Sequence, residues 1–276
     1  MHVHTTIMST KTGLPIKNQP WDQCMYMHGS PWLTPLLLLI TMLIFGCKKE
    51  DPAPEPTPTP APPSVVHRLE LVHHIDGEPL HFDSLIYVNE AGHQYSVTRL
   101  QYYVSEVVLH GTGGTTDHNI PGPYYIDGRG GNSFDLATIP SGTYGGASLL
   151  LGLSPEQNIT NALPNTMENV QMAWPEPMGG GYHFLKFEGH FINAGNSTGF
   201  AMHIGKNEHL PHCDAPGAFA ISGAAAKLIL KFDLNEVFRS PHTYELAAGN
   251  YSMGSPALMA LLRDNCADAF TIHVEP

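Results

Sequence analysis

YHFLKFEGHFI, at residues 182–192, alternates apolar and polar side chains over most of its length. A two-residue period of this kind is typical of a β-strand that buries one face. On that pattern His183 shares the apolar face with Leu185 and Phe187, whereas Glu188 lies on the polar face. The segment therefore predicts a strand with His183 turned toward the core.

Strand-like segments recur along the chain, separated by turns rich in glycine and proline, of which there are 27 and 24. This rhythm is typical of all-β domains. The other strand candidates are 65–75, 85–88, 94–97, 102–110, 124–126, 146–153, 200–204, 225–232, 242–246 and 269–274. Short helices are expected at 234–239 and 256–265. We predict a sandwich or jelly-roll-like antiparallel domain with long loops and one or two short helices.

The N-terminal part of the chain has the features of an export signal. The apolar run Leu36–Phe45 is too short to span a bilayer and fits the apolar region of a signal peptide. It closes on LIFGC at 43–47, which resembles the lipobox of bacterial lipoproteins. Residues 1–46 are therefore expected to be a leader and signal peptide, and Cys47 the lipidated first residue.

The segment from Cys47 to Pro63 is expected to be a linker, because proline occupies nearly every second position from Pro52 onward. Such a chain is extended and does not pack. Residues 64–276 then form one β domain. We expect a protein anchored by lipid to the bacterial outer membrane, on its periplasmic face or at the cell surface.

The charge of the chain argues against polyanionic partners. Its net charge is −12 at pH 7 with neutral histidines. Nucleic acids and anionic membrane surfaces are therefore disfavoured as partners. The oligomeric state is not readable from the sequence.

Two of the four cysteines are expected to pair. Cys24 lies in the leader and Cys47 is committed to lipid, which leaves Cys213 and Cys266. In an oxidising envelope compartment this pair most simply forms one disulfide. A less favoured alternative is a zinc site in HLPHC at 209–213, where the proline prevents a helix from carrying both imidazoles.

Three histidines are candidates for buried metal ligands, namely His73, His183 and His203, each among apolar neighbours in a predicted strand. A buried imidazole needs a partner, either a carbonyl or a metal. Met172 and Trp174 precede His183, and thioether with imidazole suits Cu(I) better than Mg or Ca. The sequence has neither a G-x-S-x-G nucleophile elbow nor a phosphate-binding glycine loop, so no enzyme activity is expected.

Seven motifs occur in a characteristic order along the domain. They are HHIDGEPL (73–80), GHQYSV (92–97), LQYYVSEV (100–107), IPSGTY (139–144), MAWPEPMGGGYHFLKFEG (172–189), HIG (203–205) and DNCADAFT (264–271). With these motifs the chain resembles the MbnP-like copper-binding proteins, envelope proteins associated with methanobactin and copper handling. The resemblance covers nearly the whole domain.

The resemblance implies a β-rich domain that binds one copper ion through histidines and an oxidised tryptophan. In the family a partner di-haem peroxidase opens the indole to kynurenine. His73 and His203 fall on family histidines, and Trp174 falls on the first tryptophan of a Met-x-Trp-x-Trp pattern whose second tryptophan is missing here. Met172 and His183 would line the site.

The leading hypothesis is an envelope lipoprotein that binds a single copper ion for storage, delivery or scavenging. The alternative is a surface β-sandwich for adhesion or glycan binding, with structural histidines and no metal. An exposed row of tyrosine or tryptophan on one sheet face would favour that alternative.

Overall fold

A computed structural model describes residues 66–275. The expected leader, the lipidated Cys47 and the proline-rich linker lie outside the described residues. Within residues 66–275 no helix is long and apolar enough to cross a membrane.

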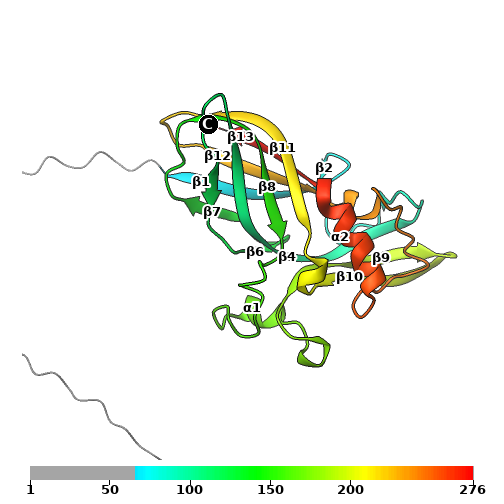
Figure 1. The fold of residues 1–276 in the computed structure, drawn as a ribbon. Coiled ribbons are helices and arrows are strands. Elements are labelled where there is room, and N and C mark those ends of the chain that lie inside the picture. Colours follow the sequence, from blue (N-terminus) through cyan, green and yellow to red (C-terminus); the bar gives the residue numbers. More distant parts are fainter. Residues whose placement is uncertain (1–65, 276) are drawn as a thin grey trace, which may run out of the picture. The chain divides into compact units, whose positions relative to one another are not determined.

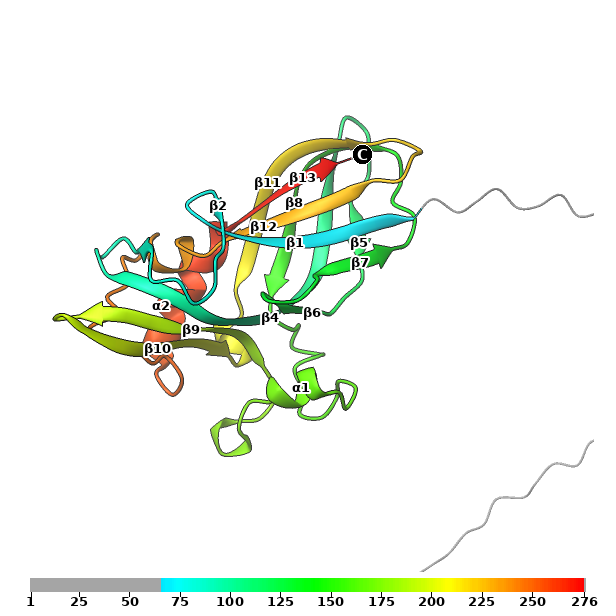
Figure 2. The same ribbon diagram turned by 180° about the vertical axis from the view of Figure 1, so that it is seen from behind.

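The described residues form two β-sheets that face each other (Figures 1 and 2). The first sheet has the order β13-β12-β1-β2, with β7 also paired to β1. Its strands are β1 (His67–Ile75), β2 (Glu78–Pro79), β7 (Ser133–Leu136), β12 (Lys227–Asp233) and β13 (Phe270–Glu275). The pairing of β1 with β12 is parallel, and the other pairings in this sheet are antiparallel.

The second sheet is antiparallel and has the order β10-β9-β4-β8-β11, with three short strands on β4. Its long strands are β4 (Gln94–Thr112), β8 (Gly142–Leu151), β9 (His183–Asn193), β10 (Asn196–Gly205) and β11 (His212–Ile221). The short strands are β3 (Tyr87–Val88), β5 (His118–Ile120) and β6 (Tyr124–Asp127).

Helices are few and short. The α-helices are α1 (Met167–Gln171) and α2 (Pro256–Asn265), and single 3-10 turns are η1 (Glu176–Met178), η2 (Asn207–His209), η3 (Glu236–Phe238) and η4 (Cys266–Asp268). Ser255 caps α2 by accepting a hydrogen bond from the Leu258 amide, and Pro256 occupies the first turn. This start signal is why α2 has the predicted bounds.

The core lies between the two sheets and is rich in aromatic rings. Tyr102 of β4 meets Phe232 of β12 edge to face, with ring centroids 5.4 Å apart, and Phe232 stacks on Phe270 at 4.4 Å. Aromatic pairs of this kind add stability beyond the area they bury. The prediction of an all-β sandwich is confirmed.

Three predicted strand segments differ from the structure, and the strands β2, β5, β7 and β11 were not expected. The two segments expected at 94–97 and 102–110 are one continuous strand, β4, and 242–246 is not a strand. β11 was not expected, because Pro216 and Gly217 interrupt its sequence pattern. Since β11 is an edge strand whose register shifts at Pro216, a proline and a glycine are tolerated there.

The predicted disulfide is not formed in the structure. Cys213 and Cys266 are both free and buried. Burial raises the pKa of the Cys266 thiol well above its usual value, and the neighbouring Cys213 raises it further. Both are therefore protonated, unreactive thiols at neutral pH.

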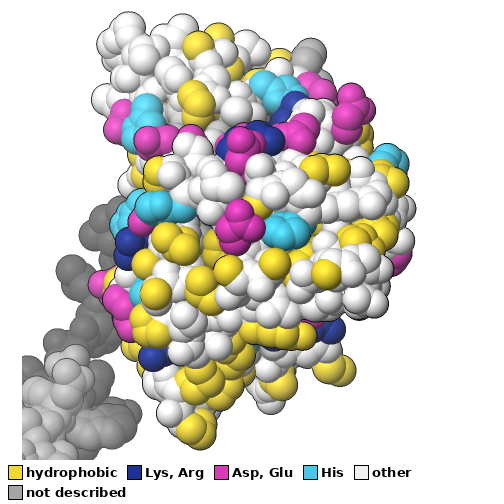
Figure 3. Space-filling view, turned by 90° about the vertical axis from the view of Figure 1, so that its right-hand side faces the viewer, with side chains coloured by type: hydrophobic (Ala, Val, Ile, Leu, Met, Phe, Trp, Pro, Cys, Tyr) yellow, Lys and Arg dark blue, Asp and Glu magenta, His cyan; other side chains and the backbone are white. Residues whose placement is uncertain are grey.

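The molecular surface reflects the acidic composition. Figure 3 shows one face on which Asp, Glu and His side chains lie among hydrophobic ones, with few Lys or Arg. Together with the net charge of −12, this surface attracts cations more than anions.

Gly189 in β9 allows a strand contact that any side chain would block. A Cβ atom at this position would lie 1.8 Å from the Ser96 carbonyl oxygen and 2.8 Å from Cε1 of Phe200. Gly189→Ala should therefore lower the free energy of unfolding by about 3 kcal/mol or more, through forced displacement of packed backbone. Urea unfolding measures this change.

The matched control is Gly223→Ala, since an added Cβ there meets nothing within 4 Å. It should change the stability by less than about 1 kcal/mol. Equal stability of the two variants would contradict the described pairing of β9 with β4.

Candidate metal centre

The pairing of β9 with β10 contains a bulge that reorients His183. His203 lies opposite Lys186 and Ile204 opposite Leu185, but Gly205 lies opposite His183, so Phe184 has no partner. One unpaired residue reverses the side to which the preceding residues point. The prediction that His183 shares a face with Leu185 and Phe187 is wrong, and His183 instead lies on the face of His203.

Three rings therefore gather on the outer side of this sheet. The centroids of His183 and His203 are 5.0 Å apart with perpendicular planes, and those of Trp174 and His183 are 4.6 Å apart. Trp174 is 1% exposed and His183 is 4% exposed. The cluster is thus shielded from solvent although it lies outside the main core.

A closed loop brings Trp174 to His183. Ala173 forms a β-bridge with Tyr182, and the Trp174 amide donates to the Gly181 carbonyl at 2.9 Å. Gly181 has φ of +82°, and a Cβ there would lie 2.5 Å from Oδ1 of Asn158. Only glycine fits this position without strain.

Gly205 makes room for the indole. A Cβ atom at Gly205 would lie 2.4 Å from Cε3 of Trp174. The HIG motif at 203–205 therefore has a physical explanation, because it supplies one imidazole and the space for the neighbouring tryptophan.

The hydrogen bonds of the two histidines fix their tautomers. Nδ1 of His183 lies 3.0 Å from the Met172 carbonyl oxygen, and Nε2 of His203 lies 2.9 Å from Oε1 of Glu188. Both oxygens only accept here, so each of these nitrogens donates its proton. Nε2 of His183 and Nδ1 of His203 are then left with lone pairs, and both are buried without a hydrogen-bond partner.

Glu188 is held as a carboxylate. Burial alone would raise its pKa, but the hydrogen bond from His203 and the charge of Arg99 outweigh that effect and lower it. Arg99 contacts the carboxylate at 2.9 Å. A carboxylate that orients a histidine through the second ring nitrogen is a recurrent feature of metal sites.

His183 is neutral at physiological pH. Burial lowers its pKa from 6.5 to about 3, and the charges of Lys186 and His203 act in the same direction. A neutral imidazole is the form that coordinates a metal.

The two rings fit one metal ion. A metal binds an imidazole nitrogen at about 2.0 Å, so two rings on one ion have centroids no more than roughly 6.5 Å apart. The observed 5.0 Å lies within this limit. Within residues 66–275, no group of three His, Cys, Asp or Glu side chains could hold a metal together. The candidate donors are therefore the two imidazole nitrogens, with the indole of Trp174 as their neighbour.

Sequence comparison gives the family. A sequence model of the MbnP family matches residues 64–255. The chain belongs to the MbnP family. The solved structure of MbnP from Methylosinus trichosporium is similar, with 14% identity, a TM-score of 0.48 and coverage of 78% of this chain and 100% of that chain. No curated protein sequence matches.

Membership of the MbnP family carries a link to methanobactin and copper. The structure brings three of the five predicted site residues together, namely Trp174, His183 and His203. Met172 is fully buried and contributes its carbonyl oxygen as the acceptor for His183.

The fifth predicted residue, His73, is not part of this cluster. Its Nε2 lies 2.9 Å from the Tyr102 hydroxyl. Tyr102 pairs with Leu185, and both side chains point into the core. His203 pairs with Lys186, the next residue along, so it lies on the opposite face of the second sheet from His73. Burial lowers the pKa of His73 to about 4. Its prediction as a partner of His203 is not supported by this arrangement.

The first MbnP motif instead builds a turn. The carboxylate of Asp233 accepts hydrogen bonds from the backbone amides of Asp76 and Gly77, both at 3.1 Å. Arg239 forms an ion pair with Asp76. These contacts give Asp76 and Gly77 a structural role in the turn, which does not require a metal.

The alternative zinc site also does not assemble. On β11 His212 is exposed and Cys213 is buried, so their side chains point to opposite faces of the strand. His209 belongs to η2.

Sequence reasoning missed Glu188 and Gly205. The prediction that Glu188 lies on the polar face of its strand is correct. The alternation of apolar and polar residues does not reveal the bulge that brings His183 to the same face. The glycine of the HIG motif was the sequence signal that could have pointed to a close contact at Gly205.

The pKa of His183 predicts how acid destabilises the metal-free protein. Because the folded-state pKa is about 3 and the unfolded value about 6.5, the unfolded chain binds more protons between these values. The contribution of His183 is complete above pH 6.5 and is lost as pH falls toward 3. It amounts to roughly 4 kcal/mol. His183→Asn should make the loss of stability over this window shallower.

Chemical unfolding at several pH values after chelator treatment measures this slope. His190→Asn, which alters an exposed histidine of the same strand, is the control and should keep the wild-type slope. Parallel curves for wild type and His183→Asn would show that His183 is not buried as described.

Proposed function

We propose that this protein binds one copper ion between His183 and His203. The observation that carries the proposal is the pair of buried ring nitrogens, Nε2 of His183 and Nδ1 of His203, which have lone pairs and no partner. An unpartnered buried acceptor costs about 1–3 kcal/mol, and a metal would satisfy both at once.

The donor set favours copper over hard cations. Imidazole nitrogens suit Cu, Zn and Ni, whereas Mg and Ca prefer oxygen ligands. Glu188, the nearest carboxylate, is engaged by His203 and Arg99. The copper link of the MbnP family supports copper among the remaining metals. Bound copper would supply a redox-active ion held by neutral donors, and the protein would store, deliver or scavenge it.

Trp174 is the candidate for oxidation to kynurenine. It is the tryptophan that remains in the family pattern, and its ring lies beside His183. The conversion cleaves the indole C2–C3 bond with two molecules of hydrogen peroxide as the oxidant, which releases two molecules of water. Hydrolysis of the formyl group then consumes one of these and releases C2 as formate. A di-haem peroxidase is the proposed partner. The aniline-type amine formed would add a third nitrogen near the pair.

We further propose an envelope lipoprotein without enzymatic turnover, anchored through Cys47 to the outer membrane. The apolar run before Cys47 and the proline-rich segment after it support this placement. The adhesion alternative would be supported by a row of exposed aromatic rings. In residues 66–275 the aromatic residue among the exposed large hydrophobic side chains is Tyr251, so no such row is present.

Copper binding should depend on both imidazoles. His183→Ala and His203→Ala should each weaken Cu(I) binding by more than about 100-fold, because losing a ligand costs more than the 10–100-fold typical of an orienting partner. Glu188→Gln should weaken it by about 10–100-fold. Competition with a chromophoric Cu(I) chelator measures these affinities, with circular dichroism as the folding check.

His73→Ala and His190→Ala are the matched controls and should bind copper like the wild type. Undiminished copper affinity in either His183→Ala or His203→Ala would contradict the site. Loss of copper in His73→Ala alone would show instead that His73, in the HHIDGEPL motif, is the ligand.

Mass spectrometry of the protein from its native envelope tests both covalent proposals. We expect lipid on an N-terminal Cys47 and kynurenine at position 174. Cys47→Ser should leave the membrane fraction. A wild-type protein that carries no lipid, or a Cys47→Ser variant that stays with the membrane, would contradict the anchor, and an intact indole would remove kynurenine from the metal centre.

A further inference from the structure

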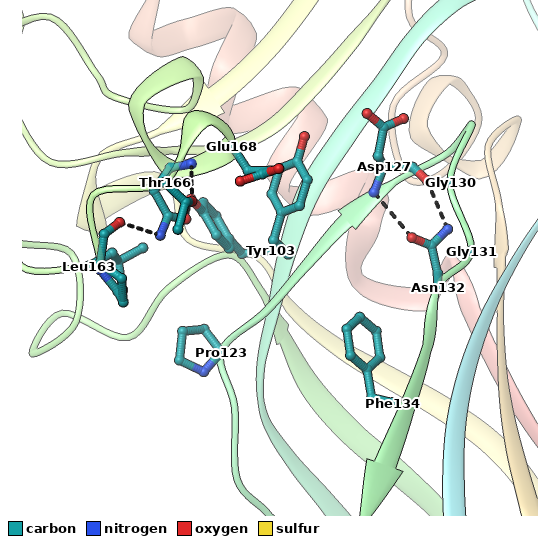
Figure 4. Close-up of a pocket in the computed structure, with 13 residues that line it drawn as sticks. Tyr103, Pro123, Asp127, Gly130, Gly131, Asn132, Phe134, Leu163, Thr166 and Glu168 are labelled. Carbon is teal, nitrogen blue, oxygen red and sulfur yellow. Dashed lines mark hydrogen bonds between the residues drawn. The ribbon is translucent and has the colours of Figure 1, made fainter.

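One cavity of the structure is not lined by His183 or His203 and has no role in the copper proposal. Its volume is ≈ 580 Å³, within the range of small-molecule sites. It opens between the turn that joins β6 to β7 and the segment that leads into α1 (Figure 4). Rings of Tyr103, Tyr125 and Phe134 form its apolar lining.

The amide side chains around this cavity are already satisfied. Oδ1 of Asn132 accepts from the Asp127 amide, and its Nδ2 donates to the Asp127 carbonyl at 2.9 Å (Figure 4). Asn169 accepts from the Tyr103 hydroxyl at 2.7 Å and donates to the Pro164 carbonyl at 2.8 Å. These hydrogen bonds hold the walls of the cavity in place.

The charged side chains that line the cavity are both acidic. Asp127 and Glu168 both line the cavity. Each oxygen of Asp127 accepts one hydrogen bond, from Gln101 or from the Arg129 amide, and keeps further acceptor capacity. The pKa of Tyr125 is raised to about 12, first by burial and then by the charges of Asp127 and Glu168, as expected if both carboxylates face this ring.

No lysine or arginine is among the residues that line the cavity. The Arg129 side chain turns away, since it contacts Asp83 at 2.7 Å and lies over the Phe82 ring at 4.2 Å. Arg99, which acts weakly on Tyr125, is engaged with Glu188. The two carboxylates of the cavity therefore have no internal counter-ion.

We propose that this cavity binds a small organic cation of the alkylammonium class. Aromatic faces attract such a cation, and two unpaired carboxylates neutralise it. The site does not depend on copper, because His183 and His203 are not among its lining residues.

Isothermal titration with choline and with its neutral isostere 3,3-dimethyl-1-butanol tests the charge requirement. Choline should bind at least tenfold more tightly than the neutral alcohol. n-Butylammonium is the second cationic arm, and its affinity relative to choline shows whether the site prefers a primary or a methylated ammonium. Methyl glucoside is the carbohydrate arm.

Asp127→Asn, Glu168→Gln and Tyr125→Leu should each weaken choline binding by roughly 3- to 30-fold. Asp214→Asn, which alters an exposed carboxylate on β11, is the matched control and should bind like the wild type. His183→Ala should also keep wild-type choline affinity, so failure of the copper proposal leaves this test valid.

Equal affinity for choline and the neutral alcohol would overturn the proposal, as would no binding of either cation. Tighter binding of methyl glucoside than of both cations would assign the cavity to glycans instead.

Discussion

A one-residue bulge at Phe184 in the pairing of β9 with β10 fixes the direction of His183, and the chemistry of the domain depends on it. Phe184 is fully buried. Gly152, with φ of +143°, leaves the space for it, since a Cβ there would lie 2.6 Å from Cγ of Phe184. Because the unpaired residue is packed on all sides, the bulge is a fixed part of the fold rather than a local irregularity.

The bulge separates stabilisation from function. On the inner face of the second sheet, Phe187 packs against Phe200 and Phe238, with ring centroids 5.5 and 5.2 Å away. On the outer face, His183 and His203 meet under Trp174. Substitutions in the imidazole pair therefore leave the aromatic core between the sheets in place. A test of the proposed copper site can thus be separated from a test of folding.

The sequence predicted most of the strands, the face of His73 and the three rings of the cluster. It did not predict the bulge that brings His183 beside His203. Alternation predicts β1 and β9 well because one face of each is buried, and Leu69, Leu71 and Ile75 do lie in the core. It fails at two places for different reasons. In β9 the period slips by one residue, which no propensity marks, and in β11 an edge position permits Pro216 where a central strand would not.

His73 shows why an inward histidine is not by itself a ligand. Its direction was predicted correctly, yet the Tyr102 hydroxyl satisfies its Nε2, whereas His183 and His203 each keep one buried nitrogen free. A free buried nitrogen is not sufficient either, since His67, His93 and His209 also have at least one. What sets His183 and His203 apart is that two such rings lie with centroids 5.0 Å apart, which depends on the three-dimensional arrangement.

The two ligand candidates are not equivalent, and this asymmetry bears on what the site can do. His183 donates to a neutral carbonyl, whereas His203 donates to the carboxylate of Glu188. A carboxylate partner makes an imidazole the more basic donor. His203 would then be the stronger ligand of the proposed ion. His183 is the first residue of β9 and follows directly after the loop that closes through the Ala173–Tyr182 bridge. Opening of that loop would move Trp174 away from the pair, whereas the pairing of β9 with β10 holds both histidines on the sheet.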